Sequence, residues 1–191
     1  MIFAVTGTPA QEMVIFKAQS AYKLNLDRLL PALKAMGTDK IWVEWKPLIA
    51  DGARSWIRDS INNFPKIEIS TLHPQRNKQV DFLCEVSHML DWLLMTEDQR
   101  NKILSWFPGA IWREPAPYSD QLSEAFMFFG VWAFSKFRPV SDGVKYHVNE
   151  QIASQVYTLF LEPVVTGTLD FELTWTQNGE TMTAKGKGRV T

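Results

Sequence analysis

The sequence predicts an α+β protein in which a small β-sheet packs on helices. Runs rich in β-branched and aromatic residues at 41–45 and 66–70 are typical of strands. The apolar residues at 82–94 have the spacing of a helix that buries one side, and the apolar stretch at 119–137 is long enough for a core helix. Near the C-terminus apolar and polar residues alternate ahead of an Asn-Gly pair, which favours a two-residue hairpin turn. We therefore expect a mixed fold that ends in a β-hairpin extension.

The other elements can be placed along the chain from turn and cap signals. Residues 10–16 fit no single pattern, and Pro31 favours a late start or a kink in the helix around it. Thr96 opens a helix through a capping pattern. In chain order we expect a strand at 2–6, a helix at 24–36, a strand at 41–45, a loop at 51–63, a strand at 66–70, helices at 82–94, 96–106, 119–137 and 149–161, and the hairpin from 169 onward, with Asn178-Gly179 at its turn.

Composition and charge limit the classes of function. A chain of 191 residues with 46% hydrophobic residues can bury a sizeable core, and a turn-rich stretch predicts a boundary between 1–140 and a C-terminal helix plus hairpin at 141–191. The formal charge of -1 predicts no general attraction to nucleic acid or to anionic membranes. The single cysteine excludes an internal disulfide. The N-terminus lacks a basic region ahead of a long apolar run, so we expect no cleaved export signal and no membrane span.

The helix at 82–94 carries the candidate functional side chains. At about 100° per residue its apolar residues share one side, whereas Cys84, Glu85, His88 and Asp91 lie on the other. Cys84 and His88 are four positions apart and point the same way, which suits two ligands of one metal ion. Glu85 lies beside them, like the glutamate of the H-E-x-x-H motif, which takes a proton from a zinc-bound water.

The order of elements and motifs is similar to that of a known family. The residues that carry the similarity are the strand at 66–70, the run Cys84-Glu85-Val86-Ser87-His88, and the later helix start Ser123-Glu124-Ala125-Phe126. This pattern resembles the minimal zincin-like metallopeptidases, especially short ones of tailed actinobacterial phages. In that family a strand precedes an H-E-x-x-H helix, and a glutamate at the start of a later apolar helix completes the zinc site. The resemblance covers roughly residues 39–137.

The resemblance implies a role for each matched residue. His88 matches the second zinc ligand, Glu85 the general base and Glu124 the third ligand, while Cys84 stands where the family has its first histidine. Zinc is therefore the candidate cofactor, with Cys84, His88 and Glu124 as its ligands. A thiolate donates more charge to zinc than a neutral imidazole does, so the bound water should be less acidic. Asp91 is the candidate carboxylate that orients the His88 ring.

Each candidate also has an ordinary explanation. Cys84 is equally well a small buried residue, Glu124 a first-turn carboxylate favoured by the helix dipole, and Asp91 a solvated helix residue. A nucleophile and base pair of Cys84 and His88 is the least favoured alternative. Two residues on one helix turn usually lack the anion-stabilising setting that such chemistry needs.

Two hypotheses of function follow. The first is a degenerate zincin-like protein that has lost peptidase activity and acts with protein partners as a structural or interaction component, in the host cytoplasm or in a phage virion. The replaced first ligand and the C-terminal hairpin favour it, because a strand edge with the basic end Lys185-Gly186-Lys187-Gly188-Arg189 can add to a partner's sheet. The alternative is an active zinc peptidase with Cys84, His88 and Glu124 as ligands and Glu85 as general base.

Overall fold

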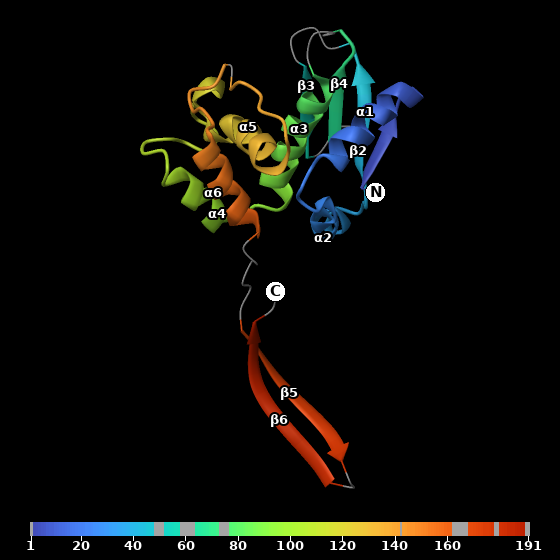
Figure 1. The fold of residues 1–191 in the computed structure, drawn as a ribbon, viewed down its shortest axis with the longest axis vertical. Coiled ribbons are helices and arrows are strands. Elements are labelled where there is room, and N and C mark those ends of the chain that lie inside the picture. The colour runs from blue at the N-terminus through green and yellow to red at the C-terminus, as the bar shows by residue number, and fades with distance from the viewer. Residues whose placement is uncertain are drawn as a thin grey trace. The chain divides into compact units, whose positions relative to one another are not determined.

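In the part of the chain that the structure describes, the first 161 residues combine a four-stranded mixed sheet with six α-helices (Figure 1). The predicted α+β class is confirmed at this level. The computed structural model describes residues 2–47, 52–57, 64–72, 77–141 and 143–161, together with the strands at 168–177 and 180–189. None of the described helices is long and apolar enough to cross a membrane.

The chain divides into two compact units, Met1–Tyr157 and Thr158–Thr191. The division falls later than the predicted boundary at residue 140. It does so because most of the following helix belongs to the first unit, where the rings of Tyr157 and Phe134 lie 6.1 Å apart.

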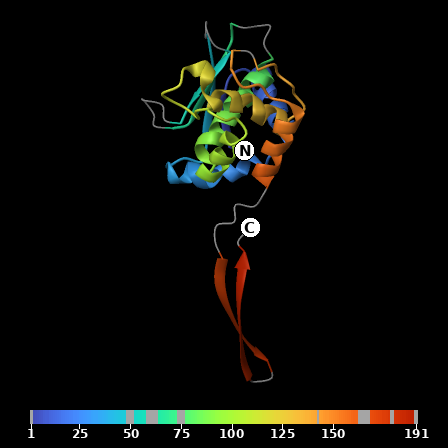
Figure 2. The ribbon, with the colours of Figure 1, turned by 90° about the vertical axis from the view of Figure 1, so that its left-hand side faces the viewer.

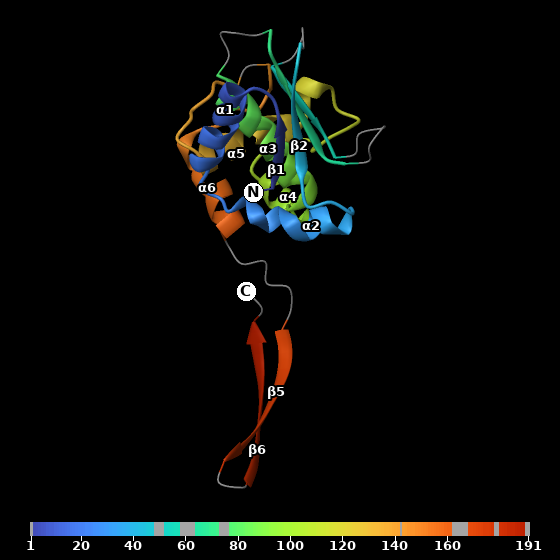
Figure 3. The ribbon, with the colours of Figure 1, turned by 90° about the vertical axis from the view of Figure 1, so that its right-hand side faces the viewer.

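The sheet contains the three strands that the sequence predicts and one that it does not. In spatial order the strands are β1 (Phe3–Thr6), β2 (Ile41–Lys46), β4 (Lys66–Ser70) and β3 (Ala53–Trp56). β1, β2 and β4 run parallel, whereas β3 is antiparallel to β4. Figure 3 shows β1 and β2 side by side. The fully buried residues Val43 and Ile67 are paired in register near the middle of the sheet.

β3 corrects the prediction of a loop at 51–63. Its four residues include one large apolar side chain and no β-branched one, so strand propensity is weak. Pairing with β4 supplies the stability instead, and Arg54 lies opposite Glu68 in the register. The Arg54 Nε atom donates to Glu68 Oε2 at 3.0 Å.

The predicted helices are present, and some begin or end elsewhere than expected. The stretch that fits no single pattern is a helix started by Thr8, whose side chain and Gln11 form a capping box. The helix expected at 24–36 is split into a 3-10 turn at Leu26–Leu29 and a short α-helix. The α-helices are α1 (Pro9–Ser20), α2 (Leu30–Ala35), α3 (Lys78–Leu93), α4 (Glu97–Leu104), α5 (Leu122–Phe134) and α6 (Glu150–Leu161).

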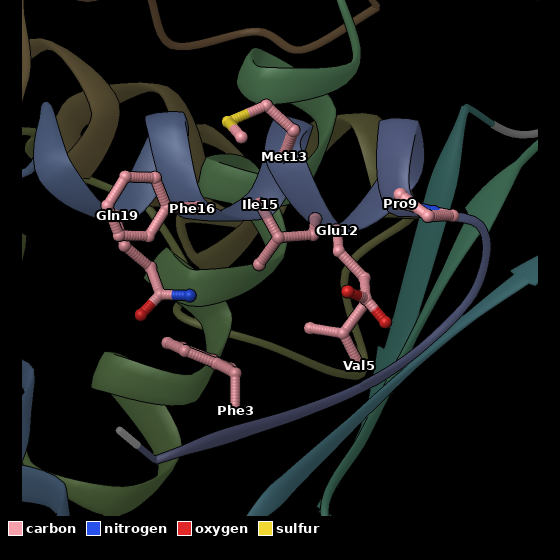
Figure 4. A pocket seen from close by; sticks show the side chains of 8 residues that line it. All are labelled: Phe3, Val5, Pro9, Glu12, Met13, Ile15, Phe16 and Gln19. Carbon is pink, nitrogen blue, oxygen red and sulfur yellow. The ribbon is translucent and has the colours of Figure 1, made fainter.

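α1 lies over β1 and leaves apolar residues facing outward. Ile15 is fully buried, whereas Met13 and Phe16 are about half exposed. Figure 4 shows Ile15 directed toward the sheet and Met13 directed away from it. A cavity of about 450 Å³ lies between α1 and β1, with Glu12 on its wall. Because α1 has apolar residues at exposed as well as buried positions, its sequence does not show the spacing of a helix with one apolar side.

α3 is the central helix of the first unit. It lies between the sheet and α5 (Figure 1). Every residue from Asp81 to Asp91 is buried, so the polar side of this helix is buried as well as the apolar side. The helices approach closely at Gly130, where an added Cβ atom would lie 2.8 Å from the Cβ atom of Ser87. Polar residues of α3 are therefore inside the protein and need partners there.

The second unit ends in the predicted β-hairpin. Its strands are β5 (Thr168–Gln177) and β6 (Glu180–Arg189), which pair antiparallel over their whole length. Figure 2 shows the two strands twisting about each other. Gln177 lies opposite Glu180, which leaves two residues between the strands. The predicted turn residues, Asn178 and Gly179, lie outside the described residues.

Candidate functional site

The structure brings His88 and Glu124 together across the two central helices. His88 lies in the middle of α3, and Glu124 lies in the first turn of α5. The His88 Nε2 and Glu124 Oε2 atoms are 3.5 Å apart. The His88 ring also stacks on the Trp92 ring, with centroids 5.5 Å apart and planes 17° apart. The imidazole is therefore held between a carboxylate and an aromatic face.

Glu85 lies one turn before His88 and is also buried. Ser55 Oγ, on β3, donates to Glu85 Oε2 at 2.7 Å. Burial raises the pKa of the Glu85 carboxyl above its usual range, although His88 and the Ser55 hydrogen bond act in the opposite direction. A carboxyl in this position takes up a proton more readily than an exposed glutamate does. Ser55 was missed because its strand was expected to be a loop.

Cys84 faces a different cavity from the His88 and Glu124 pair. Its thiol is buried and in no disulfide. Cys84 and Glu85 line a cavity of about 760 Å³, whereas His88 and Glu124 line another of about 370 Å³, together with Trp92. α3 thus carries Cys84 and Glu85 on the wall of one cavity and His88 on the wall of another.

The candidate zinc ligands do not assemble around one point. Within residues 2–47, 52–57, 64–72, 77–141 and 143–161, no group of three His, Cys, Asp or Glu side chains is arranged to hold a metal ion. The imidazole of His88 and the carboxylate of Glu124 contact each other, and Cys84 lies on the other cavity. A zinc site needs its ligands to converge on the ion at roughly 2.0–2.3 Å. Among the described residues, the side chains of Cys84, His88 and Glu124 do not meet that requirement.

Asp91 is fully buried and bonded to residues that sequence reasoning did not identify. Arg100 Nε donates to Asp91 Oδ1 at 2.8 Å, and Arg113 Nη2 donates to Asp91 Oδ2 at 2.6 Å. Trp112 Nε1 lies 3.2 Å from both oxygens, and Arg100 Nη2 donates to the Asp91 carbonyl oxygen.

The burial of Asp91 corrects one of its two sequence-based interpretations. The residue is not a solvated helix position, because its exposed fraction is 0%. Its carboxylate accepts hydrogen bonds from two guanidinium groups and an indole. The role of orienting the His88 ring stays a prediction. The side chain joins the end of α3 to α4 and to the segment before α5. No spacing in the sequence indicates these partners, which follow Asp91 by nine to 22 residues.

Comparisons with known proteins give no match. No family model matches the chain, no curated protein matches it, and no solved structure matches it.

Proposed function

We propose that the chain is a degenerate zincin-like protein that lacks peptidase activity and acts as a structural or interaction component. The observation that carries this proposal is the direct contact of His88 with Glu124, while Cys84 lies on a different cavity. In a hydrolytic zinc site these three side chains would point at one ion and leave a position for water. The resemblance to phage metallopeptidases makes a virion the proposed setting.

The buried polar residues of α3 support a structural use of this helix. Ser55 donates to Glu85, Glu124 contacts His88, and two arginines bind Asp91. Buried polar groups cost free energy unless a partner satisfies them. Each of these three residues has a protein partner that belongs to a different element. Glu85, His88 and Asp91 thus connect α3 to the sheet, to α5 and to α4.

The C-terminal hairpin supports an interaction role. In the described part of the chain, β5 and β6 form a sheet of two strands. A two-stranded hairpin is marginally stable by itself in water, and its outer edges offer unpaired backbone groups. A partner protein that adds a strand to either edge would satisfy those groups.

The alternative is an active zinc metallopeptidase. One observation favours it: His88 and Glu124, the second and third candidate ligands, lie next to each other although 36 positions separate them in the sequence. A movement of Cys84 toward this pair would be needed to complete the site. The general base in this alternative is Glu85.

Metal content and peptidase activity distinguish the two functions. We expect the purified full-length protein to hold less than one zinc ion per chain by elemental analysis after dialysis against zinc. We also expect no Glu85-dependent cleavage of a casein-derived peptide library. The Glu85→Gln variant and the original protein should therefore give the same result. One tightly held zinc ion per chain together with Glu85-dependent cleavage would contradict the proposal. A Cys84→His variant that gains zinc binding would support descent from an enzyme.

A further inference from the structure

The strand β1 lies at one edge of the sheet, and some of its backbone groups point outward. In the described part of the chain, β1 pairs with β2 on one side and with no strand on the other. The Ile41 nitrogen donates to the Ile2 carbonyl oxygen at 2.8 Å. Because successive residues of a strand direct their backbone groups to opposite sides, Ala4 also faces β2, whereas Phe3 and Val5 face the open edge. An added strand would satisfy the groups at this edge.

The cavity between α1 and β1 lies beside this edge. Its volume is about 450 Å³, and its described lining is mostly apolar. Phe3 and Val5 line it from β1, and these are the residues whose backbone groups face the open edge. Met13 and Phe16 line it from α1 and are 49% and 53% exposed. A strand added to β1 would therefore direct every second side chain toward α1 and this apolar lining.

Two polar side chains of α1 in this cavity have no partner among the described residues. The Gln19 Nε2 atom is buried and has no hydrogen-bond partner, and the exposed Glu12 carboxylate forms no ion pair there. Figure 4 shows both side chains directed from α1 toward β1. A buried amide donor without an acceptor costs free energy, which a carbonyl oxygen of an added segment would remove. The Glu12 carboxylate attracts a positive charge.

We propose that the open edge of β1 binds an extended segment of a protein partner, which adds to the sheet as a strand. The side chains of the segment that face α1 are apolar, except for one lysine or arginine next to Glu12. The outward backbone groups of Phe3 and Val5 select an extended backbone rather than a helix. Since β1 has four residues, the paired part of the segment is equally short.

A small peptide library tests the composition of the segment. Its members are acetylated heptapeptide amides in which every second residue is threonine, and the other three are valine, leucine, phenylalanine, lysine or glutamate. Fluorescence anisotropy of the labelled peptides measures binding to the folded full-length protein. We expect the tightest binders to have two apolar residues and one lysine at these positions, and to bind at least about threefold more tightly than their glutamate counterparts.

Substitution of Glu12 tests the origin of the lysine preference. Glu12→Gln should remove this preference, because the amide carries no charge to attract the lysine. Glu97→Gln is the matched control, since Glu97 is also a first-turn helix glutamate but does not line the cavity. Retention of the preference by the Glu12→Gln variant overturns the predicted basic side chain.

A backbone scan of the tightest peptide distinguishes strand addition from apolar contact alone. In an added strand, alternate peptide nitrogens donate to β1 and the others face away. N-methylation of a donating nitrogen should weaken binding at least about tenfold, whereas N-methylation of its neighbour should change it less than about twofold. Amide hydrogen exchange measured by NMR gives the matching result on the protein. The amides of Phe3 and Val5 should exchange at least about tenfold more slowly with peptide bound, while the amide of Ala4 should change little.

The outcomes separate the peptide from other occupants of the edge. Absence of binding by every library member, equal effects of N-methylation at neighbouring nitrogens, or unchanged exchange at Phe3 and Val5 overturns the proposal. Slow exchange of these amides without peptide, with protection that grows with protein concentration, indicates a second copy of the chain and also overturns it. The site contains none of the residues that carry the proposed function, so a negative result leaves that function standing.

Discussion

Replacement of Asp91 by asparagine should destabilise the protein by about 3 kcal/mol. Breaking a buried ion pair typically costs about 3–5 kcal/mol, because the remaining charge keeps its burial without its partner. The cost should lie at the low end of this range because Arg113, whose side chain is 43% exposed, can return to water. The side chain of Arg100 is 19% exposed. Asparagine keeps an oxygen for the indole of Trp112, which is 3.2 Å from the carboxylate.

Urea denaturation followed by circular dichroism measures this loss. A loss of about 3 kcal/mol is a large part of the roughly 5–15 kcal/mol that stabilises most domains, so the midpoint should fall clearly. Asp98→Asn is the matched control, since Asp98 lies exposed in the first turn of the adjacent α4. Its cost should stay within about 0.5 kcal/mol. Equal midpoints for the two variants would refute the assignment of Asp91 as a buried anchor.

Three further substitutions test the packing of the first unit. Tyr22→Phe removes a buried phenol whose oxygen lies near the Ser87 side chain, and it should leave the free energy of unfolding at pH 7 within about 1 kcal/mol of its original value. Burial also raises the pKa of the Tyr22 phenol. Above pH about 10 this phenol therefore ionises in the unfolded chain only, and the free energy of unfolding falls. Urea denaturation at several pH values should show a smaller fall for the Tyr22→Phe variant. Gly130→Ala should cost about 2 kcal/mol, since the new Cβ atom would meet Ser87, and addition of Ser87→Ala should recover part of the loss in a double-mutant cycle. Thr96→Ala should cost about 1 kcal/mol in thermal unfolding by removing the hydroxyl that accepts from the backbone of Gln99 at 3.2 Å; no shift in the midpoint would contradict the capping role.

Local sequence preferences predicted the regular elements better than they predicted burial. The strands at 41–45 and 66–70 are rich in aromatic and β-branched residues, and the structure confirms both. The strand Ala53–Trp56 has no such preference and exists because β4 offers it an edge. A strand that forms in this way depends on pairing with its neighbouring strand, so its own sequence shows no alternation of apolar and polar residues.

The polar residues of α3 show the limit of reasoning from helical periodicity. Glu85, His88 and Asp91 share one side of the helix, which on a surface helix would face water. Here that side faces other elements, and each residue finds a partner at a distance in the chain. The closeness of His88 and Glu124 was expected from the family resemblance alone, whereas the separate cavity of Cys84 was not expected.

The position of α3 limits how the protein can change during evolution. Its first half lines one cavity through Cys84 and Glu85, and its second half lines another through His88 and Trp92. The contact at Gly130 fixes the distance to α5, and the bonds of Asp91 fix the end of the helix. A shift of α3 that adapts one cavity to a new ligand would therefore alter the other as well. New specificities should arise through the loop residues that line each cavity, such as those near Val140, while α3 keeps its place.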